Sequence, residues 1–237
     1  TTLMILCNPQ NPAGNIWDCE TLARIGALCK QYDVIVVSDE IHCDLTKPGT
    51  EYIPFASVDD TCRDISVTCI APTKTFNLAG LQTAAVYAEN SILHHRMWRQ
   101  LNTDEVAEPN AFAIQATIAA FQYGEEWLDE LREYVEKNKQ YVTEFLQEKI
   151  PLIHPVAGDA TYLMWLDCRK ITESGRQFVK FIRKTSGLYV SGGNQYGRGG
   201  EGFLRVNVAT SKLVVEDGMQ RLYESVDAWL KEEKISK

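Results

Sequence analysis

Four short apolar runs in the first part of the chain predict β-strands at residues 2–9, 34–40, 65–73 and 82–89. The second run, VIVVSDE, is β-branched and apolar on both faces, which is typical of a central parallel strand. Residues 18–33 instead repeat apolar positions at a helical spacing, and Asp18 stands where it can cap that helix. Strands separated by a helix and by loops predict an α/β layer with a mainly parallel sheet.

Beyond residue 105 the pattern changes to long helices. Residues 109–124 predict a helix that ends at Gly124, and residues 125–150 predict an amphipathic helix that Pro151 ends. The remainder predicts strand, helix, strand and helix in turn, at residues 160–168, 176–187, 203–209 and 212–235. We therefore expect two domains, residues 1–130 and 131–237, with the boundary inside the long helix.

The composition of the chain excludes several classes of binding partner. The 237 residues are 45% hydrophobic, which is enough to bury a sizeable core. The formal net charge of -8 argues against nucleic acid or an anionic membrane surface as the main partner. No apolar stretch approaches the roughly 20 residues of a membrane-spanning helix. The seven cysteines contain no CxxC pair and the histidines no metal-ligand spacing, so we expect a cytoplasmic protein with reduced thiols and no metal.

Polar residues follow three of the predicted strands, in the segments CNPQNPAGN (7–15), SDEIHCD (38–44) and APTKTFN (71–77). In open α/β sheets the carboxyl ends of parallel strands line the ligand crevice. Asn11, Asp39 and Lys74 are therefore expected to converge on one ligand. Each residue also has a purely structural interpretation, because Asn-Pro forms turns, aspartate caps helices and a lysine side chain can reach solvent.

Four segments in this order, NPQNPAG, VVSDEIHCDL, APTKTFNLAGLQ and FLRVNVA, resemble motifs of the pyridoxal-phosphate enzymes of fold type I, the aminotransferase class I/II superfamily. Within it, DEIHCDL and TKTFNLAGLQ look most like the cystathionine β-lyase-like branch, which cleaves C–S bonds. The resemblance runs from about residue 5 to the C-terminus. It implies a three-layer large domain that binds pyridoxal 5'-phosphate (PLP), followed by a smaller C-terminal α/β domain.

The same resemblance implies roles for five residues around PLP. Lys74 would condense with the cofactor's aldehyde and, once free, move the substrate's Cα proton, a task suited to a desolvated amine. Asp39 would keep the pyridine nitrogen protonated, and Asn11 would hydrogen-bond the phenolic oxygen. His42 stands where many relatives have a tyrosine that touches that oxygen, with a structural histidine as the alternative. Thr73 would contact the phosphate through its hydroxyl.

Two positions depart from the aminotransferase pattern. Ala71 and Gln82 stand where those relatives often carry a serine and an arginine, so other groups have to hold the phosphate. Arg205 corresponds to the arginine that binds the substrate α-carboxylate as a planar fork, the alternative being an ordinary strand arginine. The glycine-rich segment at 191–200 lacks the ending of a P-loop, and we expect it to be a mobile loop beside Arg205.

The resemblance implies a C–S β-lyase that converts a cystathionine- or cysteine-type amino acid into a thiol, pyruvate and ammonia. An aminotransferase is the first alternative, and an inactive fragment or protein-binding module is the second. The family also implies a homodimer. Because its chains begin well before the strand at residues 2–8, we expect the first strands of the sheet to be missing and that strand to form an unpaired edge. An absent N-terminal segment would then be a further partner.

Overall fold

The structure is a computed structural model that describes residues 1–235. The chain divides into two compact units, which we describe separately. Unit 1 contains Thr1–Asn11, Asn15–Arg132 and Asp159–Thr161, and unit 2 contains Pro12–Gly14, Glu133–Gly158 and the chain from Tyr162 onward. The main division therefore falls within the long helix α6 (Glu125–Lys149).

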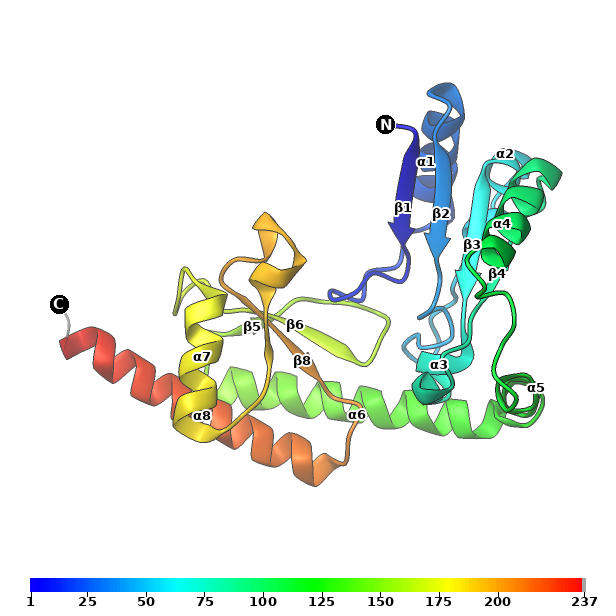
Figure 1. Ribbon diagram of the computed structural model, residues 1–237. Coiled ribbons are helices and arrows are strands. Elements are labelled where there is room, and N and C mark those ends of the chain that lie inside the picture. Colours follow the sequence, from blue (N-terminus) through cyan, green and yellow to red (C-terminus); the bar gives the residue numbers. More distant parts are fainter. Residues whose placement is uncertain (236–237) are drawn as a thin grey trace. The chain divides into compact units, whose positions relative to one another are not determined.

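Unit 1 is built on a four-stranded sheet with the order β1-β2-β3-β4 (Figure 1). Its strands are β1 (Leu3–Cys7), β2 (Ile35–Asp39), β3 (Ser66–Ile70) and β4 (Ala85–Tyr87). The first three are parallel and β4 is antiparallel to β3, so the sheet is mixed with a parallel majority, as predicted. β3 ends earlier than the sequence predicted, because Pro72 begins a helix.

The helices of unit 1 are α1 (Cys19–Gln31), α2 (Asp60–Asp64), α3 (Pro72–Thr75), α4 (Ser91–Thr103), α5 (Ala113–Tyr123) and the start of α6, with 3-10 turns η1 (Phe55–Ser57) and η2 (Ala79–Leu81). The predicted cap of α1 is confirmed, since Asp18 Oδ1 accepts a hydrogen bond of 2.7 Å from Thr21 N. The sequence did not predict α4, and none of its residues is buried. The periodic signal was nevertheless present, since Leu93, Met97 and Leu101 recur at a spacing of four residues.

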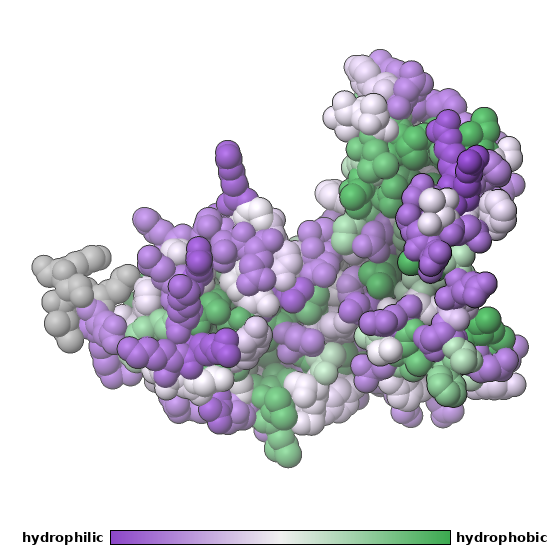
Figure 2. All heavy atoms as spheres, viewed as in Figure 1, coloured by the Kyte–Doolittle hydropathy of each residue, from purple (hydrophilic) through white to green (hydrophobic). Residues whose placement is uncertain are grey.

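One face of this sheet is packed against other elements, and the other face carries exposed residues. One face packs against α1 and η1 through a core that includes Leu6, Val36 and Phe55. Ile5 points to the opposite face, because successive strand residues alternate, and its side chain is 69% exposed. Figure 2 shows hydrophobic residues gathered over β1 and β2. β1 lies at the edge of the sheet, as expected, and carries exposed apolar residues there.

Unit 2 is built on a second four-stranded sheet, of order β5-β6-β8-β7, in which every neighbouring pair is antiparallel (Figure 1). Its elements are β5 (His154–Pro155), β6 (Leu163–Asp167), α7 (Gly175–Ser186), β7 (Ser191–Gly192), η3 (Gly193–Tyr196), η4 (Arg198–Gly200), β8 (Phe203–Asn207) and α8 (Lys212–Ile235). α7 packs against α8. Within residues 1–235, no helix is both long and apolar enough to cross a bilayer.

Asn138 is a polar residue within the otherwise apolar stripe of α6, and it is buried. Its Nδ2 donates hydrogen bonds to Val208 O at 2.9 Å and to Thr210 O at 3.0 Å. These two carbonyls belong to the segment between β8 and α8. The amide therefore satisfies backbone acceptors that neither a helix nor a strand satisfies.

We expect Asn138→Leu to lower the free energy of unfolding by about 2–4 kcal/mol, because it leaves two carbonyls without their donor. Urea denaturation of the purified chain measures this change. Lys137→Leu, at an exposed position of the same helix, is the matched control and should shift stability by no more than about 0.5 kcal/mol. An Asn138→Leu chain as stable as the wild type would contradict this role.

Candidate functional site

The parallel register of unit 1 brings the ends of three strands into one row. Cys7 pairs with Asp39, and Asp39 pairs with Cys69. The backbone continues this pairing past the strands, since Asn8 N donates to Asp39 O at 3.1 Å and Glu40 N donates to Cys69 O at 2.9 Å. The three polar segments singled out from the sequence therefore begin side by side.

Asn11 and Asp39 both neighbour the thiol of Cys7. Burial raises the pKa of Cys7, a hydrogen bond from the Asn11 backbone opposes that shift, and the negative charge of Asp39 adds to it. Asp39 is half-buried, and its Oδ1 accepts a hydrogen bond of 3.2 Å from Ile41 N. The structure thus brings these two predicted site residues together at the carboxyl ends of β1 and β2.

Lys74 and Thr73 lie on α3, the four-residue helix that follows β3. Thr73 is buried, whereas Lys74 is exposed. In this structure α3 thus presents Lys74 to solvent, between two buried threonines. Thr75 Oγ1 donates a hydrogen bond of 3.0 Å to Asp44 Oδ2, so the lysine-bearing helix is tied to the segment that follows β2.

His42 occupies the turn that follows β2, and only 3% of it is exposed. Its carbonyl accepts a hydrogen bond of 3.0 Å from Leu45 N, which closes the turn. The imidazole is therefore packed inside unit 1, at the turn that directly follows Asp39.

A buried carboxyl next to Asp39 organises the same strand ends. Glu40 is 2% exposed, and its Oε1 accepts hydrogen bonds from Ser38 Oγ at 2.8 Å and from Phe55 N at 3.1 Å. The nearby Tyr52 donates its hydroxyl to Asn8 O at 2.9 Å. The sequence analysis did not select Glu40 or Tyr52, because a glutamate beside an aspartate is usually exposed. Adjacency to Asp39 was the one available signal.

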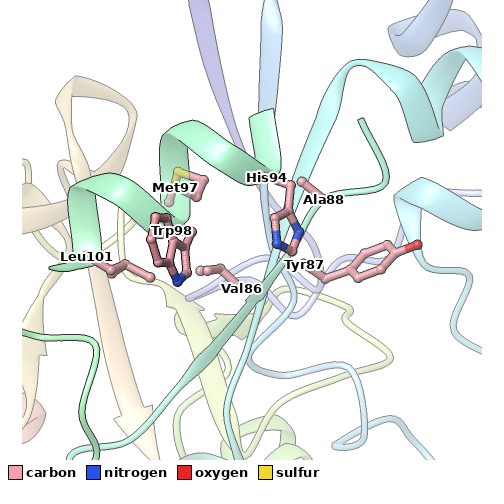
Figure 3. Close-up of a pocket in the computed structure, with 7 residues that line it drawn as sticks. All are labelled: Val86, Tyr87, Ala88, His94, Met97, Trp98 and Leu101. Atoms are coloured by element: carbon pink, nitrogen blue, oxygen red, sulfur yellow. The ribbon is translucent and has the colours of Figure 1, made fainter. Parts of the chain in front are cut away.

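An apolar pocket of about 140 Å³ lies between β4 and α4 (Figure 3). It is lined by Val86, Tyr87, Ala88, His94, Met97, Trp98 and Leu101. In Figure 3 the side chains of His94 and Trp98 point from α4 toward β4. A second pocket, of about 270 Å³, is bordered by Ala71 and Pro72, directly before Thr73, and by apolar residues of α5. The second pocket therefore adjoins the lysine-bearing helix, whereas the first contains none of the predicted site residues.

Arg205 lies in unit 2, at the middle of β8, where it pairs with Trp165 on β6 and with Ser191 on β7. It is half-buried, and its guanidinium carbon stands 5.1 Å from the centre of the Tyr196 ring. Burial raises the pKa of Tyr162, and the positive charge of Arg205 opposes that shift. The arginine predicted to bind a carboxylate thus contacts the ring of Tyr196 and lies close enough to Tyr162 to affect its pKa.

The glycine-rich segment at 191–200 forms regular secondary structure, where the sequence predicted a loop. It forms β7, η3 and η4 in succession. Gly192, Gly193 and Gly200 are buried, so the segment packs closely against the sheet of unit 2. The sequence pattern concealed this packing because glycines carry no periodic hydrophobic signal.

The family model of aminotransferase class I and II matches residues 1–222. Cystathionine beta-lyase PatB of Bacillus subtilis is 42% identical over 93% of this chain and 57% of its own length. Protein MalY of Escherichia coli is 32% identical over 95% of this chain and 57% of its own length. The chain therefore spans 57% of the length of these curated relatives.

The fold is also similar to solved structures. The crystal structure of cystalysin from Treponema denticola, which contains a pyridoxal 5'-phosphate cofactor, superposes with a TM-score of 0.92 at 28% identity. The match covers 96% of this chain and 58% of cystalysin. The predicted α/β fold is confirmed by this likeness.

The buried carboxyl of Glu40 predicts a pH dependence of stability. Burial raises its pKa above the ordinary value of 4.5, although hydrogen bonds from Ser38 and Phe55 oppose the shift. Between 4.5 and the raised value, the folded chain binds more protons than the unfolded chain, so Glu40 destabilises the fold progressively as the pH rises through that interval. The stability that the uncharged carboxyl provides, relative to the charged one, is fully present below 4.5 and is lost as the pH rises through the folded pKa.

Glu40→Gln retains an acceptor oxygen and cannot ionise, so it removes this contribution. We expect the wild-type chain to lose stability relative to Glu40→Gln as the pH rises from 4.5 toward neutrality, measured by urea denaturation at each pH. Glu51→Gln, at an exposed position of the same segment, is the matched control. A stability difference that stays constant over this pH range would show that Glu40 does not titrate as described.

Proposed function

The chain belongs to the aminotransferase class I and II family, and on this premise we propose that it carries the lysine-bearing site of a PLP-dependent C–S β-lyase. The observation that supports this most strongly is the register of β1, β2 and β3, which starts the segments of Asn11, Asp39 and Lys74 side by side. Similarity to PatB and to cystalysin favours a lyase that uses PLP.

The chemistry of the donor set fits this cofactor. The primary amine of Lys74 would condense with the cofactor's aldehyde, and the half-buried carboxylate of Asp39 would pair with a protonated pyridine nitrogen. In our proposal, the amide of Asn11 hydrogen-bonds the phenolic oxygen and the hydroxyl of Thr73 contacts the phosphate. His42 supports the turn after Asp39 from inside. When bound, PLP supplies an electron sink for the charge that develops at Cα.

In the proposed reaction, each residue either binds the substrate or holds or transfers a proton. Arg205 binds the substrate α-carboxylate through its planar fork of N–H donors. The amine of Lys74 takes the Cα proton, the bond between Cβ and sulfur breaks, and the thiolate leaves and is protonated to a thiol. Water then converts the unsaturated amino acid into pyruvate and ammonia. Asp39 keeps the ring nitrogen protonated throughout.

We also propose that the protein acts in the cytoplasm on a small amino acid and forms a homodimer. The net charge of -8 agrees with such a setting. The exposed apolar residues of β1, including Ile5, support a further covering segment or subunit over that face of the sheet.

Mixing the chain with PLP and L-cystathionine, without a keto acid, should release homocysteine and pyruvate. Lys74→Ala should lower the rate of pyruvate formation by about 10²- to 10⁴-fold, because general-base transfer of the Cα proton is lost. Lys47→Ala, at an exposed position in unit 1, is the matched control. Turnover is followed by coupling pyruvate formation to lactate dehydrogenase.

An aminotransferase is distinguished by the same assay. Amino-group transfer that requires a keto-acid acceptor, with no thiol released, would contradict the lyase and support the aminotransferase. Absence of both products, together with no binding of PLP, would support the non-catalytic alternative.

A further inference from the structure

Arg205 rests on an aromatic cluster to which the proposed reaction gives no role. The guanidinium lies over the Tyr196 ring at 5.1 Å from its centre. Tyr196 in turn meets Trp165 edge to face, with ring centres 5.6 Å apart and planes at 90°. Trp165 stacks on Phe203, with centres 5.1 Å apart and planes within 6°. Each ring is thus fixed by the next one.

The far end of the cluster is anchored as well. Arg169 lies over the Phe203 ring at 4.9 Å, and it forms hydrogen bonds of 2.9 and 2.6 Å with the two carboxylate oxygens of Asp167. The row of rings therefore runs from an arginine held by a carboxylate to Arg205. A long side chain loses rotamer entropy when it is fixed in one conformation. Because this cluster fixes Arg205 in the folded chain, that entropy is lost on folding.

The glycine-rich segment is what allows Tyr196 to reach this position. A Cβ atom at Gly193 would stand 2.2 Å from Gly200 O and 2.6 Å from the Trp165 ring. A Cβ atom at Gly200 would stand 2.0 Å from Gly193 O. All three distances are far below van der Waals contact, so only glycine lets η3 and η4 pack together against Trp165. The spacing of these glycines thus sets the location of Tyr196.

We propose that Tyr196 is a positioning residue for Arg205, and that the glycine-rich segment exists to seat its ring beneath the guanidinium. This inference rests on the proposed role of Arg205 as the group that binds the substrate α-carboxylate. The contact places the cationic carbon of the guanidinium 5.1 Å from the ring centre, and an attraction of this kind between a cation and an aromatic ring is not a hydrogen bond of the N–H donors. The ring therefore fixes the orientation of the fork while a carboxylate is received at its edge.

The first test measures the orientation of Arg205 by NMR in the chain labelled at its arginines. Ring current from Tyr196 should displace the Arg205 side-chain signals upfield, and the Nε–Hε bond should be ordered. Tyr196→Phe keeps the ring and should preserve both properties, whereas Tyr196→Leu should abolish the displacement and lower the order. An Arg205 that is disordered in the wild type, or equally ordered in Tyr196→Leu, overturns the inference.

Tyr189 provides a matched control in the same unit. Its ring lies 4.9 Å from the guanidinium carbon of Arg183, so Tyr189→Leu removes the same kind of contact elsewhere. Arg205 signals should not change in this variant. If Tyr196→Leu does not fold, the displacement of Arg205 in the wild type and its retention in Tyr196→Phe still decide the result.

The second test measures binding of L-cystathionine to the PLP-loaded chain and, where turnover occurs, KM and kcat. Tyr196→Leu should weaken binding or raise KM by about 2- to 30-fold with little change in kcat, as expected for the loss of one cation–π contact. Tyr196→Phe should restore the wild-type value. Normal binding by Tyr196→Leu, with weakened binding by Arg205→Lys, overturns the positioning role and leaves the proposed function intact.

The converse pattern identifies a failure of the proposed function. If Arg205→Lys and the wild type bind L-cystathionine equally, Arg205 does not receive the carboxylate, and both its proposed role and the substrate part of this inference are wrong. The NMR result then reports separately whether Tyr196 orders the guanidinium.

Discussion

The parallel hydrogen-bond ladder between β1, β2 and β3 is the constraint on which the candidate site depends. Its register places Cys7, Asp39 and Cys69 in one row, so the chain leaves all three strands at the same edge. A shift of one residue would turn Asp39 to the other face of the sheet, because side chains alternate along a strand. Chemistry at this edge is therefore a consequence of strand register as much as of residue identity.

Buried polar contacts preserve that register beyond the strands. The hydrogen bonds of Glu40 with Ser38 and Phe55 hold the backbone immediately after Asp39. The hydroxyl of Tyr52 does the same for Asn8, after β1. A buried carboxyl is favourable only when it is well hydrogen-bonded or protonated, so this arrangement couples the geometry of the strand ends to pH.

The sequence predicted the elements whose apolar residues recur with a clear period. The strands β1 and β2, the capped helix α1 and the long helix α6 follow that rule. Helix α4 was not predicted, although Leu93, Met97 and Leu101 recur there at a helical spacing, and β3 was extended into α3, where Pro72 starts a helical turn. Pairing of strands could not be predicted in unit 2, since antiparallel order depends on contacts between residues distant in sequence.

The candidate site was predictable to a similar extent. Order along the chain and the polar strand ends selected Asn11, Asp39 and Lys74 together. The burial of His42 and the exposure of Lys74 could not be predicted, because both depend on how neighbouring turns pack. The contribution of Tyr196 could not be predicted for another reason. Its contact with Arg205 arises only after two glycines fold back on each other, and no local pattern encodes that approach.

The most direct test of the central claim is the identity of the lysine that reacts with PLP. The chain is treated with PLP, reduced with borohydride, which fixes the cofactor to the amine that has condensed with its aldehyde, and digested for peptide mapping by mass spectrometry. We predict a single labelled site, at Lys74, and loss of the label in Lys74→Arg. Label confined to another lysine, or equal labelling of many surface lysines, would contradict the account.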